Sequence, residues 1–191
     1  MPNEGEGVIT VPAIAESGRK AYYSDYGYGE ADISAPGGER YDYPGGSPAA
    51  GSKPEKMVLS PYPEALLRAS GWIDANGNPT RPDLVKDCQD GVCAYYRYLN
   101  GTSMASPHVA GAAALAVSRF GHGRKGGFGL APAETESILR ETATDTPCPE
   151  PRTYVYPLLN PQYTATCEGT ADNNGFHGDG IVNAAAVAGA E

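Results

Sequence analysis

The chain has 191 residues, of which 40% are hydrophobic and 19% charged, and its formal net charge is -9. This length suits one domain with a sizeable core, and its 25 glycines and 17 prolines are typical of a turn-rich globular chain rather than a coiled coil. The acidic balance argues against nucleic acid as a partner, because phosphate binding needs clustered Lys and Arg. No apolar run approaches the roughly 18 residues of a membrane span, so we also expect no membrane partner.

Two short strands are expected at the beginning of the chain. Gly7–Ala15, GVITVPAIA, is a β-branched run between turn residues, which is typical of a buried strand. Glu30–Ala35 is a second candidate. The stretch that follows, about residues 38–83, is rich in Pro, Gly and Ser and has no steady period, apart from a short helix predicted at Pro63–Ser70. We interpret it as a surface insertion.

The second half of the chain predicts one strand and three helices. The strand Ala94–Leu99 leads directly to Ser103. The helix Ser103–Arg119 carries small apolar residues on every side, which predicts that it is buried in the middle of the domain. Two further helices are expected at Leu130–Ala143, which has Pro and Glu near its start, and at Ile181–Ala188.

Four cysteines allow three pairings, of which the local pairs Cys88–Cys93 and Cys148–Cys167 are favoured. An Asp90-Gly step between the first two cysteines turns the chain and brings their sulfurs together. Unpaired buried thiols are the alternative, and neither spacing is the CxxC of a metal site. Disulfides indicate an oxidising compartment, although the initial MPNEGEG has neither the basic start nor the apolar core of a signal peptide.

The residues around Ser103 indicate chemistry. A strand that delivers a serine to the amino end of a helix places its hydroxyl where free backbone N–H groups and the positive helix end stabilise a developing oxyanion. Gly101 permits a tight turn just before it. The alternative for an isolated serine in this position is a helix cap.

The eleven residues Gly101–Gly111, GTSMASPHVAG, resemble the serine motif of the subtilases, the subtilisin-like serine proteases. VITVPA, YSDYGYGEADISAPGG, LAPAETESILRETATDT and HGDGIVNAAAVAGA resemble further family segments in the family's order, so the resemblance covers almost the whole chain. It implies an α/β fold with a mainly parallel sheet flanked by helices, whose amino-terminal strands are missing from this chain. Residues 1–191 would then be the carboxy-terminal part of one catalytic domain.

The same resemblance implies a serine endopeptidase that acts on polypeptides through Ser103 and requires no cofactor for its chemistry. The family's catalytic Asp and His motifs map upstream of Met1, so the missing amino-terminal half is an expected partner and this chain alone is expected to be inactive. His108 lies five residues after Ser103 on the same helix and cannot place its ring on the hydroxyl, so a structural role is expected for it. His122 and His177 lie in glycine-rich loops, where solvated side chains are expected.

Glu30 and Asp32 are the candidates for a metal site. They correspond to acidic residues of the family's weak cation site, so the resemblance allows a structural calcium ion there, with plain surface carboxylates as the alternative. Asp74 begins a calcium-like loop, but Val85 stands at the twelfth position where a bidentate Glu is needed, so a turn is expected instead.

The cysteines and the resemblance together predict a secreted protein. A non-catalytic secreted remnant, acting as a binding or structural module, is the alternative function.

Overall fold

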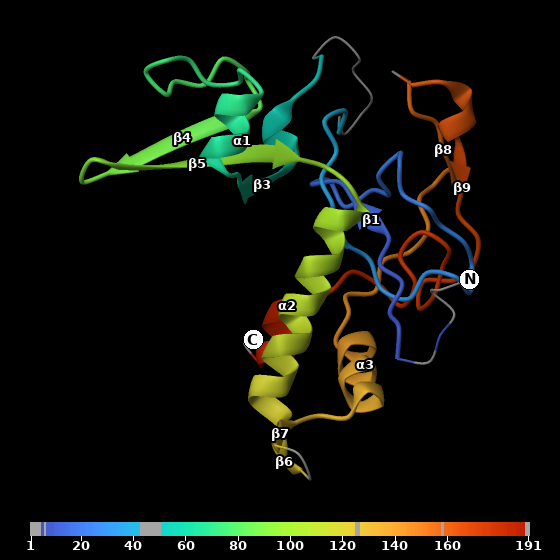
Figure 1. The fold of residues 1–191 in the computed structure, drawn as a ribbon. Coiled ribbons are helices and arrows are strands. Elements are labelled where there is room, and N and C mark those ends of the chain that lie inside the picture. Colours follow the sequence, from blue (N-terminus) through green and yellow to red (C-terminus); the bar gives the residue numbers. More distant parts are fainter. Residues whose placement is uncertain (1–4, 6, 43–50, 125–126, 158, 190–191) are drawn as a thin grey trace.

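The computed structural model describes residues 5, 7–42, 51–124, 127–157 and 159–189 (Figure 1). The helix α2 (Thr102–Phe120) is its central element, and four small residues along one side of the helix are buried: Ala105, Val109, Ala112 and Ala116. Against that side pack β1 (Ala13–Ile14), β2 (Ala35–Pro36), α3 (Pro132–Glu141) and α4 (Ala184–Ala188). The main core therefore forms where short strands and two helices meet the inner face of α2.

The strands form small sheets. β1 and β2 pair in parallel, with Ala13 opposite Ala35. The sheet of β3 (Val58–Pro61), β4 (Leu84–Gln89) and β5 (Val92–Leu99) is antiparallel in the order β3-β5-β4, and so are the pairs β6 (His122–Arg124) with β7 (Gly127–Gly129) and β8 (Thr153–Tyr154) with β9 (Ala165–Thr166). The combination of helices and sheets agrees with the expected α/β class.

The expected mainly parallel sheet is not seen in the described residues. Among their strands, β1–β2 is the one parallel pair. Parallel strands need long crossover connections, whereas the turn at Asp90, with a φ of 50°, joins β4 directly to β5 and makes that pair antiparallel. The predicted strands at 7–15 and 30–35 shrink to two residues each. Around them the chain is held by isolated bridges, such as Ile33 with Gly178 and Ser34 with Ile181.

Residues 54–99 form a unit that we call the arm: η3 (Pro54–Lys56), β3, α1 (Glu64–Ala69), β4 and β5. The arm has its own small core of Leu67, Ile73, Leu84 and Tyr95. Its first part lies within the predicted insertion at 38–83, and it folds onto the strands that follow, with β3 paired to β5. Residues 43–50 of that insertion lie outside the described residues.

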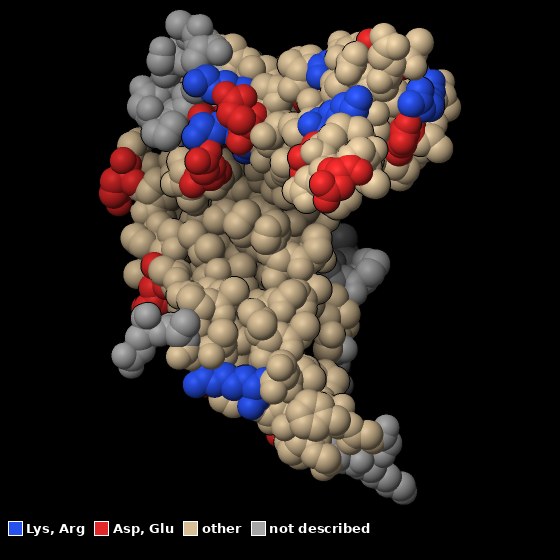
Figure 2. Space-filling view, turned by 90° about the vertical axis from the view of Figure 1, so that its left-hand side faces the viewer, with Lys and Arg blue, Asp and Glu red and all other residues tan. Residues whose placement is uncertain are grey.

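The prediction that α2 is buried on every side is wrong for this chain. Beside the four buried residues, most of the helix is exposed, including Leu115 at 41% and Phe120 at 43%. Figure 2 shows a broad surface with few charged side chains below the arm, along this side of the molecule. Small residues can pack on all sides, but the described elements cover only one side of α2.

Among the helices of the described residues, none has both the length and the apolar character that a membrane span requires.

Both favoured disulfides are confirmed. Cys88–Cys93 joins directly opposed residues of β4 and β5, and Cys148–Cys167 closes a span of 19 residues. Buried Cys167 belongs to a third cluster with Tyr156, Ala165 and Phe176, beside β8, β9 and η4 (Pro161–Tyr163). This disulfide therefore lies at the edge of an aromatic core.

Candidate active site

The turn that presents Ser103 is held between three segments of chain. β5 ends at Leu99, which pairs with Val58 of the arm. The Gly101 N–H then donates to the Gly37 carbonyl at 3.0 Å, which ties the turn to the segment after β2. Ser103 follows as the second residue of α2.

The contact between Gly37 and the turn requires a glycine. A Cβ at Gly37 would lie 2.5 Å from the Cβ of Ala13, 2.7 Å from the Gly101 carbonyl oxygen and 2.9 Å from the Tyr23 hydroxyl. The same hydroxyl donates to the Gly38 carbonyl at 2.5 Å, and burial raises the pKa of Tyr23, which keeps it a donor. The segment after β2 thus approaches the serine turn without room for a side chain.

The position of Ser103 in α2 gives it the features that the sequence predicts. Its side chain is exposed. At the second position of a helix the backbone N–H has no acceptor within the helix, and the helix dipole favours negative charge there. A hollow of about 290 Å³ lies beside it, lined by Val58, Ser60, Ser103, Met104, Pro107 and His108. The arm therefore forms part of the wall next to the serine.

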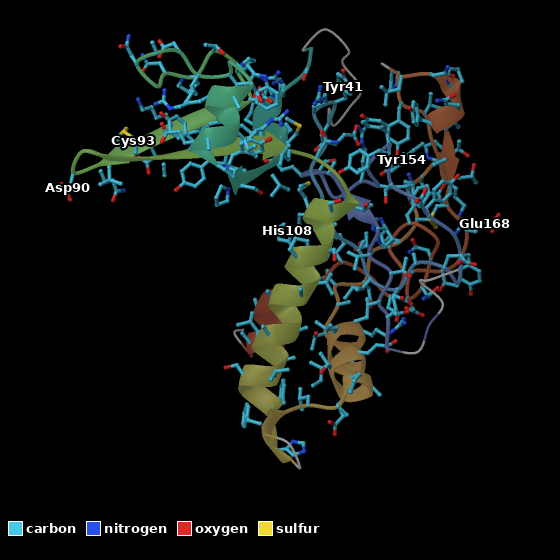
Figure 3. All side chains as sticks on the ribbon, viewed as in Figure 1. Tyr41, Asp90, Cys93, His108, Tyr154 and Glu168 are labelled. Atoms are coloured by element: carbon cyan, nitrogen blue, oxygen red, sulfur yellow. A yellow bond between two sulfur atoms is a disulfide. The ribbon has the colours of Figure 1, made fainter. Side chains whose placement is uncertain are left out.

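No hydrogen bond joins Ser103 to a histidine among the described residues. His108 (Figure 3) is exposed, and its Nδ1 lies 2.8 Å from the Met104 carbonyl oxygen, one turn back along α2. This contact directs the ring along its own helix. His122 is exposed in β6, as predicted.

The prediction that His177 is solvated is wrong. It is 3% exposed, its Nδ1 lies 3.2 Å from Ser34 Oγ, and burial lowers its pKa to about 4. The glycines around it reflect close packing and not a loose loop: a Cβ at Gly178 would lie 2.3 Å from the Asp32 carbonyl. The segment of His177 is held by the long-range bridge from Ile33 to Gly178, which leaves no pattern in the sequence around the histidine.

Glu30 and Asp32, the candidates for a cation, lie in different surroundings. Glu30 is exposed. The two carboxylate oxygens of Asp32 accept from Arg140 Nη2 at 2.5 Å and from the Thr10 N–H at 2.7 Å. The guanidinium of Arg140 brings a positive charge to Asp32, which disfavours a calcium ion there, and the described residues contain no group of three or more His, Cys, Asp or Glu that could hold a metal.

The Asp74 loop is a turn, as predicted. Asp74 Oδ1 accepts from the backbone N–H groups of Asn76 and Asn78, at 2.9 and 2.7 Å, in an exposed segment. These hydrogen bonds lower the pKa of Asp74 and use the carboxylate within its own loop.

Comparison with known proteins agrees with the motif around Ser103. The subtilase family model matches residues 1–176. An "Extracellular protease" of Xanthomonas campestris pv. campestris is 33% identical over 147 residues, which are 77% of this chain and 17% of that relative. The chain thus spans about a sixth of the length of the curated relative it matches, and no solved structure matches it. With a family match over most of its length, this chain belongs to the subtilase family.

Proposed function

We propose that this chain carries the nucleophile of a serine endopeptidase, Ser103, and that it works together with residues from outside the chain. The observation that carries the proposal is the exposed Ser103 hydroxyl at the start of α2, beside a hollow and inside the family's serine motif. Family membership and the printed name of the relative support a protease.

In this proposal Ser103 Oγ attacks the carbonyl carbon of a peptide bond. A histidine takes the serine proton and an aspartate orients that histidine, and we place both upstream of Met1. The backbone N–H of Ser103 donates to the oxyanion that forms, and the start of α2 stabilises its charge. The proton then passes from the histidine to the leaving amine, and water releases the acyl group by the same route.

The exposed side of α2 is where we place the missing half of the domain. Ala110, Gly111 and Ala114 are exposed there, and such small side chains allow another backbone to approach closely. An upstream segment on this surface would cover apolar area and bring a histidine to Ser103 at the same time. Secretion is part of the proposal, since two disulfides and an extracellular relative both fit it.

The experiment is to produce this chain together with the protein encoded immediately upstream of Met1, or with the upstream half of a close relative, and to assay casein cleavage. Ser103→Ala should abolish turnover, whereas Ser106→Ala should leave it close to the unchanged complex. Ser106 is a matched control, because it is also an exposed serine of α2, one turn further along.

Two outcomes would count against the proposal. Cleavage that survives Ser103→Ala would mean that another residue is the nucleophile. A stop codon directly upstream of Met1, or a stable complex without turnover, would favour the non-catalytic binding module.

A further inference from the structure

Arg140 on α3 joins three carboxylates that come from different parts of the chain. Its Nη2 lies 2.5 Å from Asp32, just before β2, and its Nη1 lies 2.6 Å from Asp179, in the loop before α4. Nη2 also lies 3.0 Å from Glu136, one turn earlier on α3. The four side chains are 21 to 30% exposed, so this is a half-buried cluster and not a set of surface pairs.

We propose that the guanidinium of Arg140 holds this corner of the fold in place of a bound cation. The proposal starts from the disagreement at Asp32, which stands where the family resemblance allows a calcium ligand but faces N–H donors. A guanidinium offers several donors in a fixed plane, so it can bind carboxylates from separate segments, as a metal ion would.

The remaining oxygens of Asp32 and Asp179 accept hydrogen bonds from N–H groups of the protein. The second oxygen of Asp32 accepts from the Thr10 N–H, and Asp179 Oδ1 accepts from the side-chain amide of Asn173 at 2.5 Å. A calcium ion needs six to eight oxygen ligands, and the positive guanidinium of Arg140, which already lies between Asp32 and Asp179, opposes a second cation there. Although burial alone would lower the pKa of Arg140, its hydrogen bonds to Asp179 and Asp32 raise it, so it stays charged.

The cluster lies where the segment before β2 meets the loop before α4. The Asp179 N–H donates to the Asp32 carbonyl at 2.9 Å, and the Ser34 N–H donates to the Gly180 carbonyl at 2.9 Å. From this junction the chain runs through β2 to Gly37, which receives the serine turn. Arg140 therefore stabilises the segment that positions the turn before Ser103. In this proposal that role needs no calcium ion.

Hydrogen–deuterium exchange on the 191-residue chain tests this inference, because exchange is read segment by segment. The amides of residues 174–182 should exchange at the same rate in EDTA and in millimolar calcium chloride. Arg140→Met should speed exchange in this segment by about tenfold, since three carboxylates lose their shared counter-charge. Arg68→Met is the matched control, because Arg68 pairs with Glu64 on an exposed helix face and should leave the segment unchanged.

A double variant separates charge from packing. Arg140→Met with Asp179→Asn removes one of the uncompensated charges, so it should exchange more slowly than Arg140→Met alone. Slower exchange on adding calcium to the unchanged chain would overturn the inference, because it would show that this corner takes a cation. An Arg140→Met variant that exchanges no faster than Arg68→Met would overturn it as well.

Discussion

At the scale of single residues, the serine site depends on close approach of backbone more than on side-chain contacts. The strand–turn–helix around Ser103 could be predicted from sequence because its neighbours on the chain carry the signal. The hydrogen bond from Gly101 to Gly37 could not, because it joins residues 64 positions apart and leaves no local pattern. The burial of His177 against Ser34 escaped prediction for the same reason, since it depends on contacts across 143 residues.

Gly37→Ala tests this view of the turn. The new Cβ has no room beside Ala13 and Gly101, so the serine turn must shift. We expect about 1–3 kcal/mol lower free energy of unfolding, measured by urea denaturation, and slower reaction of Ser103 in the complex with the upstream half. Gly129→Ala, where a Cβ meets nothing within 4 Å, should stay within about 0.5 kcal/mol of the parent. Equal effects for the two variants would contradict the close approach.

The buried His177 predicts a pH dependence. In the unfolded chain it binds a proton near its ordinary pKa of 6.5, but in the folded chain only near pH 4. The unfolded state therefore binds more protons between these values, and the free energy of unfolding falls as pH drops from about 6.5 towards 4. The integrated loss is on the order of 3 kcal/mol.

His177→Asn should flatten this pH profile, measured as the urea midpoint between pH 7 and pH 4.5. His122→Asn, at an exposed site in β6, should keep the slope of the parent. A His177→Asn profile as steep as that of the parent would show that other groups cause the loss of stability.

At the scale of elements, the helices and the strand at 94–99, which lies within β5, were predicted better than the two strands near the beginning of the chain. The interiors of α3 and α4 lie where their patterns place them, but both are shorter than predicted, because α3 begins at Pro132 and α4 begins after Asn183, whose side chain caps the Ala186 N–H at 2.9 Å. The β-branched runs predicted long strands, whereas β1 and β2 have two residues each. Strand length depends on a partner strand, and a partner cannot be read from one run of residues.

The two disulfides should differ in their contribution to stability. Cys88–Cys93 closes a span of five residues in an exposed hairpin, worth about 2 kcal/mol by loop entropy, whereas the 19-residue span of Cys148–Cys167 is worth about 3 kcal/mol. Replacing each pair by serines should therefore cost about 1 kcal/mol more for Cys148–Cys167, and the burial of Cys167 adds to that difference. Urea denaturation of the two double variants compares them. A larger loss from the hairpin pair would refute this ranking.

At the scale of the whole molecule, the sequence of α2 predicts an environment that the described residues supply only in part. Its small residues predict cover on all sides, and the described elements cover the side of Ala105 and Val109. The mismatch is informative, because the uncovered side is the one next to Ser103. A pattern along one helix indicates what the helix packs against, even where the described residues do not include the packing partner.

Two substitutions at Gly111 distinguish the stability of the chain alone from its binding to the proposed upstream half. A Cβ at Gly111 meets nothing within 4 Å, so Gly111→Ala should raise the stability of the chain alone by about 0.5–1 kcal/mol through helix propensity. Gly111→Leu should weaken binding of the upstream half, measured by co-purification, because this surface then lacks room for a second backbone. Unchanged co-purification of Gly111→Leu would show that the missing half does not lie on this side of α2.

Labelling with a fluorophosphonate, followed by peptide mapping, tests the central claim most directly, because this probe reacts only with an activated serine. The account predicts no labelling of the 191-residue chain alone, and labelling of Ser103 once the upstream half is bound. Equal labelling of Ser103 in the chain alone would contradict the account, because the activating residues would then lie within this chain. A stable complex in which Ser103 stays unlabelled would contradict it too, and would make the chain a binding module.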